Sequence, residues 1–153
     1  MIGCNLLKNM SGMYYLTDKI NYIGKEVTGI SKNNNVWMIP DMYWPEITSK
    51  GHYVSHESVC VLNTGSEVCD IKMTLYFEDR SPISLTSKCL PKRTKHIRMD
   101  QAVLENGDSI PKGLAYSAKV ECSVPVVVQY TRVDTTQNSN SIMTTMAYRL
   151  DDQ

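Results

Sequence analysis

The sequence predicts an all-β domain, an antiparallel β-sandwich of seven to eight strands with a jelly-roll-like arrangement. Three observations predict this fold class. Apolar and polar residues alternate with a period of two in several segments, turn residues separate those segments, and no long stretch keeps helical spacing. The connections are too short for helical crossovers, so neighbouring strands are expected to run antiparallel.

The expected strands follow one another from residue 36. Residues 36–39 form a short apolar strand closed by Pro40, and residues 58–62 are apolar enough to be buried on both faces. Residues 71–77 alternate cleanly, as in a strand with one face in the core. Further strands are expected at residues 83–90, 95–99, 116–122, 124–131 and 143–148. The run at 124–131 is rich in β-branched residues, which indicates a central strand.

The first part of the chain differs from the rest. Residues 1–35 mix aromatic and charged residues without a clean period and end in a polar cluster. They are interpreted as an N-terminal extension or linker, and residues 36–150 as the sandwich domain. A first strand or short helix docked on the sandwich is the alternative.

Composition limits the classes of function. The 153 residues carry 16 basic and 16 acidic side chains, and such a neutral chain is poorly suited to non-specific nucleic-acid binding. The five cysteines are odd in number and lack a C-x-x-C pair, so neither a disulfide framework nor a zinc ribbon is expected. The sequence has no signal peptide and no apolar membrane span, which predicts a cytoplasmic protein without membrane insertion.

No catalytic motif is found. The sequence lacks a Gly-x-Ser-x-Gly elbow, a cysteine with a motif-spaced histidine and a glycine-rich phosphate loop, so we expect no catalytic residue and no cofactor. A two-histidine, one-carboxylate metal site would consist of His56, His96 and Glu57. Their spacing does not support it, and hydrogen bonds from the two imidazoles to backbone at strand ends are expected instead.

Two polar segments are candidates for binding. Residues 92–98 contain four cations and a histidine, and Lys95, His96 and Arg98 are expected to face an acidic partner, a phosphate or a nucleic-acid backbone. Charges that protect an edge strand from aggregation are the alternative. Arg132 and Asp134 follow the central strand and are expected to pair with each other or with Glu57, because buried polar groups need partners.

A small polar ligand site is a further hypothesis. Six side chains on adjacent strands would converge on the ligand: His56, Glu57, His96, Arg98, Gln129 and Arg132. Trp37 or Trp44 would supply an aromatic platform for a sugar ring, although core or subunit contacts are the commoner role of such aromatics.

Four co-linear blocks, residues 56–63, 93–98, 124–134 and 144–148, together closely resemble the sensory rhodopsin transducer family. The resemblance extends from about residue 36 to residue 148. It implies a β-sandwich that assembles as a homotetramer and partners a light-sensing membrane protein from the cytoplasm. The resemblance also implies a likeness to sugar-binding modules, and members of the family are credited with DNA binding.

We therefore predict a non-enzymatic cytoplasmic signalling or interaction module that forms a homo-oligomer, a tetramer if the resemblance holds. Its partner would be a membrane photoreceptor or another signalling protein. The alternative is a binder of a carbohydrate or small anion. A DNA-binding regulator is the least favoured of the binding hypotheses, because the net charge is zero.

Overall fold

The computed structural model describes residues 6–8, 14–16, 35–48 and 51–150. The chain divides into two compact units, residues 1–30 and 31–153. In the first unit, β1 (Leu6–Lys8) and β2 (Tyr14–Leu16) pair as antiparallel strands. The rest of the predicted extension, apart from Asn35, lies outside the described residues.

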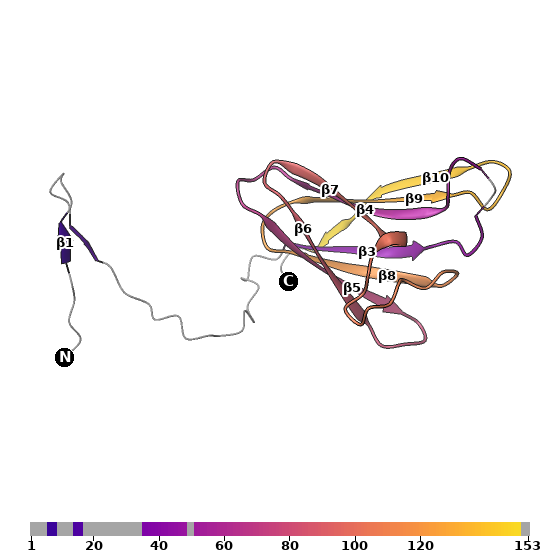
Figure 1. Ribbon diagram of the computed structural model, residues 1–153, viewed down its shortest axis with the longest axis horizontal. Helices are drawn as coiled ribbons and strands as arrows, with labels where there is room; N and C mark the ends of the chain where they lie inside the picture. The colour runs from indigo at the N-terminus through magenta and orange to yellow at the C-terminus, as the bar shows by residue number, and fades with distance from the viewer. Residues whose placement is uncertain (1–5, 9–13, 17–34, 49–50, 151–153) are drawn as a thin grey trace. The chain divides into compact units, whose positions relative to one another are not determined.

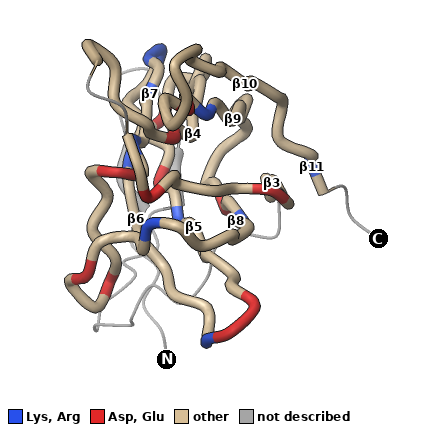
Figure 2. The backbone as a smooth tube through the Cα atoms, turned by 90° about the vertical axis from the view of Figure 1, so that its right-hand side faces the viewer, with Lys and Arg blue, Asp and Glu red and all other residues tan. Residues whose placement is uncertain are grey.

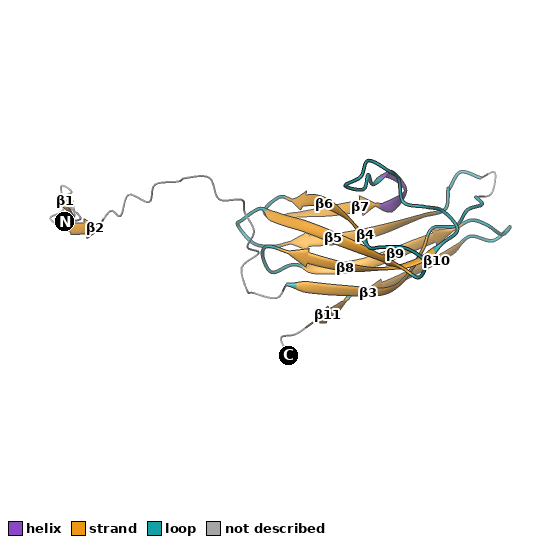
Figure 3. Cartoon of the chain, turned by 90° about the horizontal axis from the view of Figure 1, so that it is seen from below, coloured by secondary structure: helices purple, strands orange, loops and turns teal. Residues whose placement is uncertain are grey.

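The second unit is a β-sandwich, which confirms the predicted fold class (Figures 1 and 3). One sheet has four strands in the order β10 (Ser141–Met146), β9 (Val127–Asp134), β4 (His56–Asn63), β7 (Arg93–Arg98). The other has five strands in the order β11 (Tyr148–Leu150), β3 (Val36–Tyr43), β8 (Ala115–Cys122), β5 (Cys69–Phe77), β6 (Ile83–Cys89). All neighbouring strands are antiparallel. A 3₁₀ turn, η1 (Met99–Gln101), follows β7.

The last predicted strand is divided between the two sheets. Residues 143–148 were expected to form one strand, whereas β10 pairs with β9 in one sheet and β11 pairs with β3 in the other. Ala147 joins them, is buried, and donates its backbone N–H to the carbonyl of Val128 at 3.1 Å. The described sandwich therefore has nine strands rather than seven or eight.

The expectation that Pro40 closes the first strand is wrong. β3 continues through Pro40 and Asp41 to Tyr43, and its register against β8 shifts between Ile39 and Met42. Both residues of this bulge are exposed. A bulge leaves a residue outside the ladder of hydrogen bonds, so the missing N–H of proline is tolerated there.

The core lies between the two sheets and is built from alternate residues of each strand. In β5, Cys69, Ile71, Met73 and Leu75 are buried. β4 alternates in the same way, since Val59 and Val61 are buried whereas Leu62 is 44% exposed. The expectation that residues 58–62 are buried on both faces is therefore wrong for the isolated chain.

Replacing Leu75 by alanine should lower the free energy of unfolding by about 2–5 kcal/mol, because this fully buried side chain would leave a cavity. Urea denaturation followed by tryptophan fluorescence measures the change. Leu90→Ala is the matched control, because Leu90 is 60% exposed, and it should cost less than about 1 kcal/mol. Equal losses at the two positions would contradict the assignment of Leu75 to the core.

Candidate functional site

Strand alternation separates the predicted site residues into two groups. Residues opposite each other in neighbouring strands share a face, and successive residues alternate faces. The inner face of the four-stranded sheet holds Glu57, Arg132 and Asp134. The outer face holds His56, His96, Arg98 and Gln129. These side chains therefore do not converge on one ligand.

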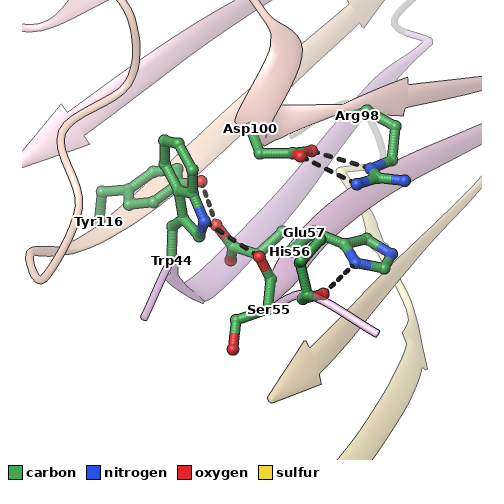
Figure 4. A network of polar contacts seen from close by, with 8 residues as sticks. Trp44, Ser55, His56, Glu57, Arg98, Asp100 and Tyr116 are labelled. Carbon is green, nitrogen blue, oxygen red and sulfur yellow. Dashed lines mark hydrogen bonds and ion pairs between the residues drawn. The ribbon is translucent and has the colours of Figure 1, made fainter. Parts of the chain in front are cut away.

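Glu57 is the centre of the inner group. Its carboxyl group is fully buried and accepts three hydrogen bonds. The backbone N–H of Tyr43 donates to Oε1 at 2.7 Å, and the Tyr130 hydroxyl donates to the same oxygen. The Tyr116 hydroxyl donates to Oε2 at 2.5 Å (Figure 4). One side chain thus connects β4 and β9 of one sheet to β3 and β8 of the other.

The two tyrosines remain hydrogen-bond donors over a wide pH range. Burial raises the pKa of Tyr116 and of Tyr130 above the ordinary tyrosine value, and the adjacent Glu57 carboxyl raises both further. The positive charge of Arg132 offsets a smaller part of each pKa shift. The network is therefore built from protonated phenols around an acceptor.

Arg132 does not pair as predicted. It lies opposite Glu57 in the register of β4 and β9, but its ion pair is with Asp41, with Nη2 3.9 Å from Oδ2. Asp134 instead accepts the backbone N–H of Thr136 at 2.8 Å. Hydrogen bonds from Thr136 are the main cause of its lowered pKa, and Arg132 adds a smaller effect. The carboxylate partner of Arg132 is therefore Asp41 in the β3 bulge, and not Asp134 or Glu57 as the sequence predicted.

Sequence patterns missed two parts of this inner group. Alternation alone places Tyr116 and Tyr130 in strands, and the signal that could have found the network is that a buried tyrosine hydroxyl requires a partner and Glu57 also occupies an inward position. A second cluster joins Thr48, Ser55 and Thr135, in which the Thr135 hydroxyl oxygen lies 2.8 Å from that of Thr48 and 3.0 Å from that of Ser55. These residues lie in connections or just beyond strands, where no periodicity identifies them.

The outer group is more exposed. His56 Nδ1 lies 2.8 Å from the carbonyl of Val54, a backbone contact at a strand end. Gln129 donates to the Thr144 hydroxyl at 2.6 Å, and Arg98 makes two 2.8 Å bonds to Asp100 (Figure 4). His96 is exposed, and it shares a row across the sheet with Gln129 on either side of Cys60.

Lys95 and the two tryptophans lie elsewhere. Lys95 is exposed on β7, at the edge of the sheet. Trp37 and Trp44 are each only 9% exposed, and Trp44 donates its indole N–H to the carbonyl of Ser55 at 3.2 Å. The ammonium of Lys112 lies 4.6 Å from the Trp44 ring centroid. Neither indole offers the open face that the predicted aromatic platform requires, because both pack in the core.

The two-histidine, one-carboxylate metal site does not assemble. Glu57 faces the interior, whereas His56 and His96 lie on the opposite face of the sheet. Within the described ranges, no group of three or more His, Cys, Asp or Glu side chains is arranged to hold a metal ion.

Comparison with known families identifies the chain. The family model described as Anabaena sensory rhodopsin transducer matches residues 32–149. The chain belongs to this transducer family. The match covers the whole nine-strand sandwich except Leu150, the last residue of β11.

Two solved structures support membership of the transducer family. The crystal structure of Thermotoga maritima 1070 has a TM-score of 0.68 and 37% identity, covering 77% of this chain and 96% of that one. The Anabaena sensory rhodopsin transducer has a TM-score of 0.57 and 32% identity, covering 65% of this chain and 87% of that one. A comparison with curated proteins returned no match. The described residues contain no helix long and apolar enough to cross a membrane.

Raising the pH above about 10 should destabilise the transducer domain through Tyr116 and Tyr130. Their pKa values are raised in the folded state, so above that pH the unfolded chain loses protons that the folded chain keeps. The stabilisation that the two protonated tyrosines contribute is complete below about pH 10 and declines as the pH rises further. Urea unfolding midpoints between about pH 8 and pH 11.5 measure the decline.

The Tyr116→Phe and Tyr130→Phe variants should each lose about 1.5–3 kcal/mol at neutral pH, because a buried carboxyl loses a donor. The same variants should show a shallower decline above pH 10. Tyr148→Phe is the control, because Tyr148 is 69% exposed. The variant that carries both substitutions tests the pair together. If its urea unfolding midpoint declined above pH 10 as steeply as that of the unmodified chain, the proposed role of the buried phenols would be refuted.

Proposed function

We propose that the chain is a non-enzymatic, cytoplasmic interaction module that transmits a signal by docking a sensory rhodopsin or a related signalling protein. Membership of the transducer family is the observation that carries this proposal. The absence of a nucleophile motif from the sequence agrees with it. The name of the Anabaena relative, a sensory rhodopsin transducer, suggests the class of partner.

The outer face of the four-stranded sheet supports an interaction role. Four of its apolar side chains are exposed in the isolated chain: Leu62 (44%), Val127 (44%), Ile142 (73%) and Met146 (56%). Leu62 and Val127 lie directly opposite each other, and all four project from the same face of the sheet. Met146 lies opposite Gln129, in the row next to Leu62 and Val127, whereas Ile142 lies at the other end of the sheet. Exposed apolar side chains on one face of a sheet are typical of protein contact surfaces.

We assign this apolar part of the outer face to self-association as a homotetramer. A contact between copies of the chain there would cover the outer-face side chains of β4 and β9 that are exposed in the isolated chain. The small-ligand hypothesis has less support, since strand alternation separates its six side chains and both tryptophans are buried.

Sedimentation of the purified chain should give a mass four times the 17.3 kDa of one copy. Leu62→Lys should shift the chain toward smaller species, because a contact would bury the new charge. Tyr76→Lys is the matched control, since Tyr76 is 39% exposed on a strand of the other sheet. A monomer mass for the unmodified chain would refute the tetramer.

Partner docking is tested with a sensory rhodopsin in lipid nanodiscs and the chain as analyte. The chain should bind the receptor and not empty nanodiscs. His96→Glu should weaken binding by about tenfold, because it places a negative charge on an exposed part of the surface. Lys72→Glu, an exposed position on the other sheet, should have little effect. Absence of binding to the receptor would count against the proposed function.

A further inference from the structure

The basic segment around β7 carries charges that the chain itself does not neutralise. Lys92, Arg93 and Lys95 are exposed, and none has a carboxylate within 4.0 Å among the described residues. Arg98, at the end of the strand, is paired with Asp100. Within this segment the cations without a carboxylate partner are thus Lys92, Arg93 and Lys95, in a chain whose net charge is zero. Figure 2 marks the Lys and Arg positions along the backbone in blue.

β7 is also an open edge. It is the last strand of the four-stranded sheet and pairs only with β4 among the described strands. An edge strand leaves alternate backbone N–H and C=O groups without a strand partner, and such an edge can accept another extended chain. The cations therefore lie on a strand that has backbone hydrogen bonds to offer.

A cavity of about 260 Å³ lies beside this edge, between β7 and β6, the edge strand of the other sheet. Its lining includes Lys95 and Ile97 of β7, the hydroxyl residues Thr86 and Ser87 of β6, and Gln101. Hydroxyl, amide and ammonium donors around a cavity of this size suit a carboxylate side chain. Ile97 is buried and provides an apolar contact for the aliphatic part of such a side chain.

We propose that the β7 edge binds an extended acidic segment of the protein partner, which adds a strand to the four-stranded sheet. Arg93 and Lys95 are two residues apart and share a face of the strand, so acidic residues at alternate positions of the segment match them. One carboxylate enters the cavity beside Lys95. The Arg98–Asp100 ion pair leaves no net charge at the far end of β7, so the charged part of the segment lies near residues 92–95.

A peptide is favoured over a nucleic acid by the geometry. The backbone groups of an edge strand are satisfied by another peptide backbone, which a phosphate chain does not supply. The chain also has no net positive charge to attract a polyanion that extends beyond the short basic segment. This inference rests on the proposed function, because it takes the partner to be a protein.

Fluorescence anisotropy with a labelled nine-residue peptide of alternating threonine and glutamate tests the inference. The full chain should bind this peptide, and the Arg93→Glu and Lys95→Glu variants should each weaken binding by about tenfold. Lys72→Glu makes the same charge change away from the β7 edge and should leave binding unchanged. A peptide with a central proline should bind at least about tenfold more weakly, because it cannot complete the backbone ladder.

Four outcomes would overturn the inference. They are no binding of the threonine–glutamate peptide, equal binding of the proline peptide, equal weakening by Lys72→Glu, and equally tight binding of a single-stranded oligonucleotide of the same charge. Failure of the inferred β7 site is distinguishable from failure of the proposed function. If the chain binds the receptor in nanodiscs but not the acidic peptide, the function stands and the β7 site is wrong. If the peptide binds and the receptor does not, the β7 site stands and the receptor class is wrong.

Discussion

The buried carboxyl group of Glu57 is the interaction on which the arrangement of the sandwich depends. A carboxyl group removed from water is costly unless donors surround it, and three donors do so here. Those donors come from β3, β8 and β9, so the two sheets must hold one spacing and one register to satisfy them. A slip of one residue in β4 would place Glu57 outside and leave two tyrosine hydroxyls in the core without a partner.

The β3 bulge helps to make this interaction possible. β11 pairs with β3 only over Val36–Met38, so further along β3 the backbone has no strand on that side. Tyr43 lies in this region, just beyond the bulge, and its N–H reaches Glu57. Asp41 within the bulge meets Arg132, whose charge lies close enough to affect both tyrosines. A local irregularity thus supplies both a donor and a counter-charge.

The orientation of Glu57 also decides what the sheet presents outside. With Glu57 inward, the alternate residues of β4 project outward and align with those of β9 and β7. The outer face therefore carries the exposed apolar side chains, whereas Arg93 and Lys95 lie opposite Asn63 and Val61 of β4 and share their inward face at the β7 edge. The two proposed contacts, one between copies and one with a partner, therefore use different parts of the sheet, its outer face and its β7 edge.

The sequence by itself determined the fold class, most strand positions and the family, because period-two alternation and the four matched blocks are local properties of the chain. It also identified Glu57, Arg132 and the basic segment as unusual. Only the tertiary structure decided which of them meet. Glu57 lies 59 residues from Tyr116 and 73 from Tyr130 along the chain, and alternation does not specify which strands become neighbours. The bulge at Pro40 and the division of the last strand between two sheets likewise follow from pairing between distant segments, which no local pattern records.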